Sequence, residues 1–247
     1  MSNCIALDNV KIRFGDLLVL SDLSFSVENG ETVALIGPSG CGKSTLLRVI
    51  AGIIPHMISA EVSGDISTAG TMDMMFQESN LLPWRTVKSN VELGLELLDR
   101  KVSSDQVMRL LQDVGLKGFE NSYPFQLSGG MKQRASLVST LITSPDILLM
   151  DEPFGSLDAL TREDMWEVLG KMCQQQDKPP AMILVTHSID EAVVLADRIL
   201  IMGVRPGRIV SELSIRIDKP RHKDGMLLDE CLELTNKIRM SIREANA

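Results

Sequence analysis

Cysteine and aromatic residues are scarce in this sequence of 247 residues. The cysteines lie far apart and none belongs to a Cys-x-x-Cys pair; they are Cys4, Cys41, Cys173 and Cys231. This spacing excludes a zinc ribbon and a redox dithiol, and it favours a reducing compartment. Aromatic residues make up only 4% of the chain, but 44% of the residues are hydrophobic, which is enough for a sizeable core. A disordered chain and a disulfide scaffold are therefore excluded.

Long hydrophobic runs and an excess of positive charge are also missing. No run approaches the roughly 20 apolar residues that span a bilayer, and residues 1–14 lack the apolar centre of a secretory leader. We therefore expect a cytoplasmic protein that meets a membrane only through a partner. Lys and Arg number 25 against 33 Asp and Glu, which gives a net charge of −8. Since this charge repels nucleic acids, a phosphate ligand must be held by local geometry.

The sequence does contain short apolar runs that alternate with helix-like stretches. The runs are typical of strands, several of them buried on both faces, and the stretches between them have the spacing of helices. This alternation predicts an α/β fold with a parallel sheet and crossover helices. The predicted strands are residues 5–14, 19–27, 32–36, 62–67, 71–76, 147–150, 182–185 and 199–202.

The region 86–138 interrupts the alternation because most of its pattern is helical. Ser103 or Ser104 can cap its second helix, and Gly115 can end that helix. We predict a core formed by residues 1–85 and 139–215, a helical insertion at residues 86–138, and a C-terminal helical tail at residues 216–247.

Residues 37–45 match the pattern GxxxxGK[ST] between a predicted strand and a predicted helix, which is the context that this phosphate-binding motif requires. The glycines let backbone N–H groups turn towards a phosphate, and the helix start adds partial positive charge. Lys43 is expected to reach the β- and γ-phosphates, and Ser44 to bind Mg²⁺. The alternative is a glycine-rich turn with a surface lysine. We also expect the Cys41 thiol to line the site and to react with alkylating reagents. The predicted phosphate-binding residues are Gly37, Pro38, Ser39, Gly40, Cys41, Gly42, Lys43, Ser44 and Thr45.

Two adjacent carboxylates follow the apolar run at residues 147–150. Because side chains alternate along a strand, Asp151 and Glu152 are expected to point in different directions. Asp151 can then support hydrated Mg²⁺, while Glu152 can orient or deprotonate an attacking water. For the pair alone, the alternative is a solvated acidic strand end.

Residues 127–134 read Leu-Ser-Gly-Gly-Met-Lys-Gln-Arg and lie between these two elements. Here the chain resembles the ATP-binding cassette family, whose motifs occur in the same order: phosphate loop, a glutamine at a strand end (Gln77), this signature, the Asp-Glu pair and a histidine (His187). The resemblance covers about residues 5–202. It implies a phosphate-loop (P-loop, RecA-like) parallel-sheet core, an N-terminal antiparallel β subdomain, an inserted α-helical subdomain, and an ATPase that uses ATP and Mg²⁺.

The resemblance also implies the roles of single residues. Ser128, Gly129 and Gly130 would form a second anion site that closes on ATP held by another copy, so a head-to-tail homodimer is expected. Phe14 would stack on adenine, although a core phenylalanine is a nearly equal alternative. Asp158 would lie at the dimer interface or cap the following helix. The expected catalytic residues are Glu152, His187 and Gln77, and the expected Mg²⁺ ligands are Ser44, Gln77 and Asp151.

Two stretches, residues 77–87 and 151–162, resemble the nitrate, sulfonate and taurine branch of bacterial importers. Trp84 would then line a groove for a permease helix, or else pack against the helical insertion. The implied protein is a peripheral subunit at the cytoplasmic face of the inner membrane. Its partners would be permease subunits and, indirectly, a solute-binding protein, without nucleic acid.

Two alternatives stay open at this point. One is a soluble cassette ATPase that acts on nucleic acid or ribosomes, and the other is a module that uses ATP only to hold a dimer together. The acidic charge argues against the first, and Glu152 argues against the second. The chain departs from the family at Ser139, where arginine is usual; this affects a structural ion pair and not the phosphate contacts.

Overall fold

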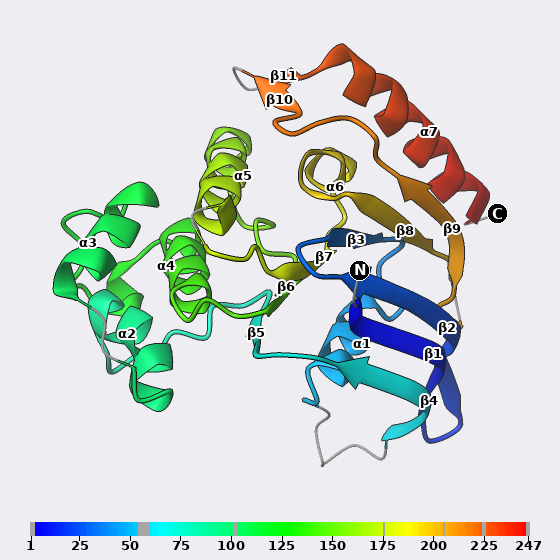
Figure 1. Cartoon of the computed structure of the whole chain (residues 1–247), viewed down its shortest axis with the longest axis horizontal. Helices are drawn as coiled ribbons and strands as arrows, with labels where there is room; N and C mark the ends of the chain where they lie inside the picture. The colour runs from blue at the N-terminus through cyan, green and yellow to red at the C-terminus, as the bar shows by residue number, and fades with distance from the viewer. Residues whose placement is uncertain are drawn as a thin grey trace.

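A six-stranded sheet forms the centre of the molecule, and helices cover both of its faces (Figure 1). The structure is a computed structural model that describes residues 3–53, 60–100, 103–174, 176–204, 206–223 and 226–245. Neighbouring strands are parallel except for the last pair, which confirms the predicted α/β fold. In spatial order the strands are β5 (Met72–Met75), β6 (Ile147–Asp151), β7 (Ala181–Val185), β3 (Thr32–Ile36), β8 (Arg198–Met202) and β9 (Ile209–Ser214).

The central strands are apolar because both of their faces are buried. Strands β3, β6 and β7 are buried at every position. In β3, Val33 and Leu35 pack in the hydrophobic cluster that contains helix α1 (Lys43–Ile50), whereas Ala34 and Ile36 pack with helix α6 (Ile189–Leu195). This burial on both faces is the reason that continuous apolar runs predicted these strands.

A second sheet is antiparallel and lies beside the first, with α1 between the two (Figure 1). Leu46 and Leu47 of α1 share one buried cluster with Ile12 and Leu23 of the antiparallel sheet and Leu149 of the central sheet. Helix α1, which follows the phosphate loop, is therefore fixed from both sides. The strands of this sheet are, in spatial order, β2 (Leu17–Glu28), β1 (Asn3–Phe14) and β4 (Ala60–Thr68).

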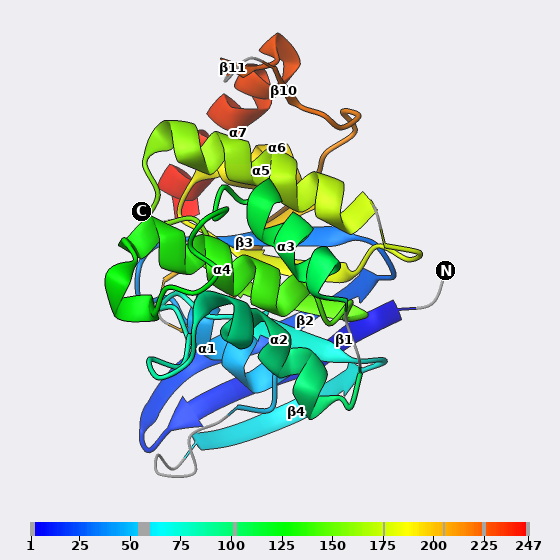
Figure 2. The same cartoon turned by 90° about the vertical axis from the view of Figure 1, so that its left-hand side faces the viewer.

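A group of helices occupies one end of the molecule and faces the viewer in Figure 2. Of the two serines that the sequence offered as caps of the second helix, Ser103 is the cap, because its hydroxyl accepts a hydrogen bond of 3.2 Å from the N–H of Gln106. The last helix of the group, at residues 129–141, packs on the central sheet, because its Leu137 shares one buried cluster with Leu148 of β6. The group comprises α2 (Val87–Leu97), α3 (Ser104–Asp113), the short 3₁₀ helix η1 (Pro124–Gln126) and α4 (Gly129–Leu141).

Helices α5 (Ala159–Gln174), α6 and α7 (Asp229–Ala245) cover the face of the central sheet opposite to α1 (Figure 2). The predicted tail helix is α7, but it begins later than its apolar pattern suggested. Residues before it form a two-stranded ribbon of β10 (His222–Lys223) and β11 (Met226–Leu227). Residues 224–225 and 246–247 of the predicted tail lie outside the described residues.

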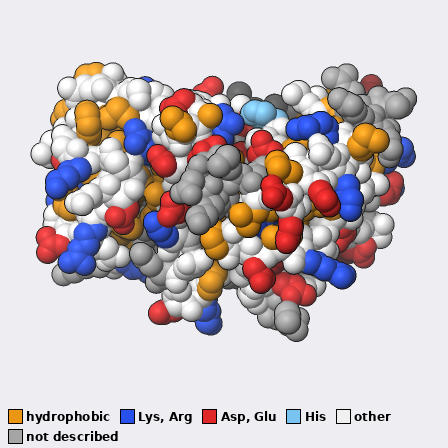
Figure 3. All heavy atoms as spheres, turned by 90° about the horizontal axis from the view of Figure 1, so that it is seen from above, with side chains coloured by type: hydrophobic (Ala, Val, Ile, Leu, Met, Phe, Trp, Pro, Cys, Tyr) orange, Lys and Arg blue, Asp and Glu red, His pale blue; other side chains and the backbone are white. Residues whose placement is uncertain are grey.

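The sequence did not predict β9, the antiparallel edge strand. Its positions alternate between half-buried and exposed, so it lacks the continuous apolar run of the strands beside it. Among the described residues, no helix is long and apolar enough to cross a bilayer. Figure 3 shows acidic, basic and hydrophobic side chains interspersed over the face seen from above.

Candidate active site

The phosphate loop connects β3 to α1, and two of its glycines fit where other residues would not. Gly42, the N-cap of α1, has a φ of 101°, and a Cβ there would lie 2.5 Å from Cδ2 of Leu20. A Cβ on Gly37 would lie 2.5 Å from the carbonyl oxygen of Met202. Only glycine allows the backbone to turn this closely against β2 and β8. The loop therefore has the tight turn that a phosphate cradle requires.

Lys43 folds inward onto this loop. Its Nζ donates hydrogen bonds of 2.8 Å to the carbonyl of Gly37 and 2.9 Å to the carbonyl of Pro38, and the residue is 7% exposed. The ammonium group is therefore already held against the loop by weak neutral acceptors. A phosphate, which offers charged oxygens, is the stronger partner for it.

The thiol of Cys41 lies next to the phosphate lysine but is buried, since its Sγ accepts a hydrogen bond of 3.7 Å from Nζ of Lys43. Cys41 is 1% exposed, and its side chain belongs to the core cluster between the two sheets. Its Sγ would lie 3.3 Å from a Cβ on Gly37. The backbone of Cys41 is part of the loop, but its thiol is buried, so ready alkylation is not expected.

Asp151 ends β6 beneath the start of α1. Its Oδ1 accepts a hydrogen bond of 2.7 Å from the hydroxyl of Ser44, and the residue is fully buried. Burial raises the pKa of Asp151, and the hydrogen bond from Ser44 opposes that shift. Its Oδ2 is buried without a hydrogen-bond partner among the described residues. A free carboxylate oxygen beside a hydroxyl offers hard oxygen ligands for a divalent cation.

Glu152 points to a different set of partners. Its Oε2 lies 3.2 Å from Nε2 of Gln77, which donates to it, and 3.3 Å from Nδ1 of His187. Three residues that were predicted from distant parts of the sequence thus meet at one carboxylate. The backbone of Glu152 has a φ of 48°, and its N–H donates to the carbonyl of Val185 at 2.9 Å. As predicted, the adjacent carboxylates diverge, Asp151 towards Ser44 and Glu152 towards His187.

The signature residues lie elsewhere in the chain. Ser128 caps α4, and its hydroxyl accepts a hydrogen bond of 3.2 Å from the N–H of Met131. Ser128 and Gly129 are exposed. Helix α4 packs against α2, α3, α5 and β5, whereas α1 packs against β6 and β7. Figure 1 accordingly places the two helices on different sides of the molecule. The two helix starts are therefore apart within one chain, and binding of an anion at each of them stays a prediction.

Three other predicted residues have mixed outcomes. Phe14 is half-buried and packs at the edge of the core cluster of the antiparallel sheet, so its stacking on adenine stays a prediction. Asp158 caps α5, since its carboxylate accepts hydrogen bonds from the N–H and the hydroxyl of Thr161 at 3.1 and 2.7 Å. Trp84 is 71% exposed, which contradicts packing against the helical insertion.

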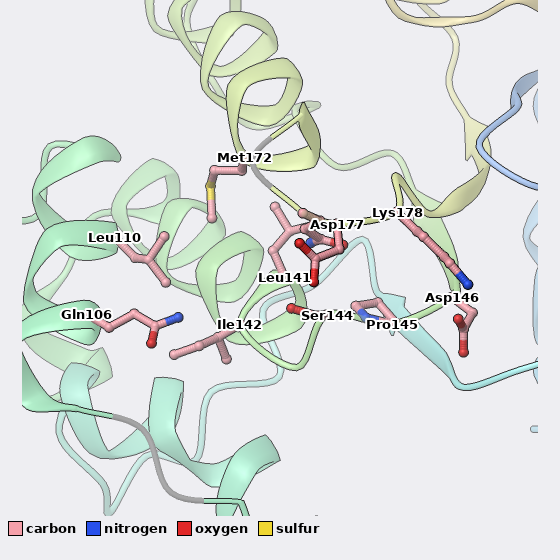
Figure 4. A pocket seen from close by; sticks show the side chains of 11 residues that line it. Gln106, Leu110, Leu141, Ile142, Ser144, Pro145, Asp146, Met172, Asp177 and Lys178 are labelled. Carbon is pink, nitrogen blue, oxygen red and sulfur yellow. The ribbon is translucent and has the colours of Figure 1, made fainter.

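A cavity of about 540 Å³ lies away from this cluster (Figure 4). Its lining includes Leu110 of α3, Leu141 of α4, Met172 of α5 and Asp146. Asp146 precedes β6, whereas Asp151 ends it, so the cavity adjoins the amino end of that strand. The predicted site adjoins the carboxyl ends of the strands, where ligands bind in open α/β sheets.

Comparisons with known proteins agree with this geometry. The profile of the ABC transporter family matches residues 20–155. The chain is 44% identical to the aliphatic sulfonates import ATP-binding protein SsuB 1 of Rhodococcus jostii (strain RHA1), over 96% of this chain and 98% of the relative. The chain belongs to the ABC transporter family. It is an ABC ATPase, a protein that binds and hydrolyses ATP, and this confirms the family and the activity expected from the sequence.

Other relatives extend this result. The ABC ATPase is 42% identical to the uncharacterized ABC transporter ATP-binding protein MJ0412 of Methanocaldococcus jannaschii, over 89% of this chain and 82% of that protein. It is 28% identical to the ATP-binding cassette MJ0796, solved as a dimer in a post-hydrolysis state with ADP and Pi. That structure has a TM-score of 0.74 and covers 87% of this chain and 100% of its own chain. The P-loop fold is confirmed.

Sequence reasoning missed two residues beside the Glu152 cluster. Arg162 of α5 donates to the carbonyl of Leu157, and Glu191 of α6 accepts from Thr186. An acidic residue in the first turn of a helix usually complements the helix dipole at the surface. That pattern gave no sign that Glu191 is buried.

Proposed function

We propose that this chain is the ATP-hydrolysing subunit of an importer for sulfonate-like organic anions. One observation carries the reaction: Gln77 and His187 converge on Glu152 next to the Ser44–Asp151 pair. The cargo is supported by relatives at 42–45% identity that are named aliphatic sulfonates import ATP-binding proteins.

In the proposed reaction, water attacks the γ-phosphorus of ATP, the bond to the bridging oxygen breaks, and ADP and phosphate leave. Glu152 orients the water and accepts its proton, and Gln77 holds the carboxylate in place. His187 contacts the γ-phosphate. Lys43 leaves the carbonyls of the loop and binds the β- and γ-phosphates, while Phe14 stacks on adenine.

Mg²⁺ would be held by Ser44, Gln77 and Asp151. The Oδ2 of Asp151 has no hydrogen-bond partner in the part of the chain that the structure describes. Together with the adjacent hydroxyl of Ser44 it fits a hard cation that prefers oxygen ligands. When bound, the ion neutralises the charge that develops on the phosphate oxygens. Asp151 is ionised more readily beside such a cation, because the added charge opposes the effect of burial on its pKa.

The proposed assembly is a head-to-tail homodimer in which Ser128, Gly129 and Gly130 of one copy close over ATP held by the other. Two observations support it: the start of α4 is exposed, and α4 packs away from α1 within one chain. The related cassette MJ0796 is dimeric. A symmetric pair of composite sites follows from such an arrangement.

Transport requires partners that carry the solute. Permease subunits would bind near Trp84, whose exposed indole lies in the segment before α2. A solute-binding protein would act through the permease, at the far side of the inner membrane, with this chain peripheral on the cytoplasmic face. The net charge of −8 disfavours nucleic acid. We assign the core to residues 1–85 and 139–215, the signature subdomain to residues 86–138, and the tail to residues 216–247.

The reaction is tested by comparing the purified protein with its Glu152→Gln variant in Mg-ATP. Loss of the general base should lower turnover by about 100-fold or more, while the variant should still bind ATP and dimerise. Phosphate release and gel filtration measure both. Turnover equal to that of the wild type would remove Glu152 from the reaction.

The cargo is tested by uptake of a labelled alkanesulfonate in cells that lack this gene, with labelled sulfate as the control. Loss of sulfonate uptake alone, restored by the wild-type gene and not by Glu152→Gln, is the expected outcome. Unchanged sulfonate uptake would contradict the assigned cargo.

A further inference from the structure

A buried carboxylate lies behind the Glu152 cluster and has no role in the reaction described above. Glu191 of α6 is 3% exposed, and its Oε2 accepts a hydrogen bond of 2.7 Å from the hydroxyl of Thr186. Its Oε1 is buried without a partner among the described residues. A buried carboxylate with a hydrogen bond to only one of its oxygens lowers the stability of the fold, so the presence of Glu191 here needs a reason.

A cation on the neighbouring helix is in the same condition. Arg162 of α5 donates from Nη2 to the carbonyl of Leu157 at 3.0 Å, but its Nε is buried and without a partner in the described part of the chain. Helices α5 and α6 pack against one another, and the guanidinium stabilises the ionised form of Glu191. The Nε donor of Arg162 and the Oε1 acceptor of Glu191, both without a partner among the described residues, therefore lie on neighbouring helices and have opposite charge.

Each of these residues also holds a segment that leads to the catalytic cluster. The hydroxyl of Thr186, which donates to Glu191, accepts from the N–H of Ser188 at 3.0 Å. These two contacts bracket His187. Leu157, which is held by Arg162, lies in the loop of residues 153–158 that follows Glu152.

We propose that Glu191 and Arg162 form a positioning pair that fixes His187 and the loop 153–158 relative to each other during hydrolysis. In the ATP-bound state, Nε of Arg162 donates to Oε1 of Glu191 and satisfies both orphaned atoms. The pair touches neither ATP nor water; it acts through Thr186 on one side and Leu157 on the other. This inference rests on the proposed roles of Glu152 and His187.

The chemistry of the pair suits this task. A hydrogen bond between charged groups is roughly twice as strong as one between neutral groups, and it holds two segments with little freedom when buried. Displacement of a catalytic group by about 1 Å can lower a rate by about 100-fold. A pair that sets the distance between His187 and Glu152 would therefore affect turnover more than nucleotide binding.

The test compares Glu191→Leu, Glu191→Gln and Arg162→Met, together with the double variant Glu191→Leu/Arg162→Met. Asp190→Asn is the matched control, because Asp190 is exposed on the same turn of α6. The measurements are turnover in Mg-ATP, affinity for a fluorescent ATP analogue, and melting temperature, all on the full chain.

We expect a graded loss of kcat: about threefold for Gln, which keeps an acceptor oxygen, and about tenfold or more for Leu and for Arg162→Met. The double variant should be no slower than the slower single variant, because either single substitution already removes the interaction between the two residues. Affinity for the analogue should stay within about twofold, and Asp190→Asn should match the wild type.

Three results would overturn the inference: Leu and Gln variants as fast as the wild type, losses that multiply in the double variant, or an affinity that falls in parallel with kcat. Where Arg162→Met does not fold, Thr186→Val, which removes the hydroxyl from Glu191, replaces it in the comparison. A wild-type protein without turnover would instead contradict the proposed function itself.

Discussion

Glu152 has a left-handed backbone with a φ of 48°, a conformation that strains a residue other than glycine by about 1–3 kcal/mol. The strain coincides with the point where the two carboxylates part. Asp151 keeps its strand geometry and meets Ser44, whereas the turn at Glu152 directs its side chain to Gln77 and His187. The backbone distortion therefore separates the carboxylate that we propose to hold Mg²⁺ from the carboxylate that we propose to accept the proton of water.

Burial of Glu191 also destabilises the folded protein, and the effect can be measured as a dependence of stability on pH. Burial raises the pKa of Glu191 from 4.5 to about 7, with the Glu152 charge adding to the shift and with Thr186 and Arg162 opposing it. Because the folded pKa lies above the unfolded one, the folded protein loses stability as pH rises from about 4.5 to about 7.

Glu191→Gln carries no charge at any pH, so it should escape this loss. Its free energy of unfolding should rise relative to the wild type by about 1–3 kcal/mol between pH 4.5 and pH 7.5. Urea unfolding at several pH values measures the difference, with Asp190→Asn as the control for removal of an exposed carboxylate. A difference that stays constant with pH would show that the pKa of Glu191 is the same in the folded and the unfolded protein.

The residues of the candidate site could be predicted from the sequence to different degrees. The phosphate loop and the Asp-Glu pair follow from pattern and neighbouring elements, because their chemistry depends on local spacing. The meeting of Gln77 and His187 at Glu152 depends on strand order; the family resemblance named the three residues as catalytic but did not predict their contacts. Arg162 and Glu191 gave no signal, since burial is a property of the fold.

At the scale of elements, some strands are likewise predictable from their local sequence, whereas others depend on the fold. Strands β3, β6 and β7 are buried on both faces, and their apolar runs predicted them. Strand β9 forms one edge of the sheet, and its burial alternates, so it lacks that signal. The start of α7 was misplaced because Leu227 pairs in β11, an interaction that helical spacing does not show.

Helix α5, which carries Arg162, offers a test of element stability. Gly170 lies inside this helix, and a Cβ there would meet no atom within 4 Å. Gly170→Ala should therefore stabilise the protein by about 0.5–1 kcal/mol, since alanine is the better helix former and its backbone loses less conformational entropy when the chain folds. Chemical unfolding measures the change, and turnover should stay the same.

The control is Gly115→Ala, at the end of α3. Gly115 has a φ of 68°, and a Cβ there would lie 2.9 Å from Nη1 of Arg134. This substitution should destabilise the protein by about 1 kcal/mol or more, because alanine is strained at positive φ. Equal effects of the two substitutions would mean that local backbone geometry does not determine either result.

At the scale of the whole molecule, one chain holds two helix starts that suit anions and keeps them apart. The start of α1 lies under the phosphate loop, and the start of α4 is exposed among the helices of the other end (Figure 1). Moving one helix start to the other within a chain would require α4 to leave its packing against α2, α3 and α5. Bringing in the start of α4 from a second chain costs no such packing.

Cross-linking distinguishes these arrangements, because the native thiols do not interfere. Cys4, Cys41, Cys173 and Cys231 are all buried, at 6% exposure or less. Ser39 of the phosphate loop and Ser128 of the signature are both exposed. One sample of the Glu152→Gln protein carries Ser39→Cys and another carries Ser128→Cys, and a short bismaleimide is added with and without ATP.

A head-to-tail dimer predicts a cross-linked pair only in the mixture of the two samples and only with ATP, since each composite site joins Ser39 of one chain to Ser128 of the other. Either sample alone should stay monomeric on a denaturing gel. A product from Ser39→Cys alone would instead place the two phosphate loops together, which is a head-to-head pair. Cross-linking within a single chain that carries both cysteines, at a protein concentration too low for dimers, would show that one copy closes its own site.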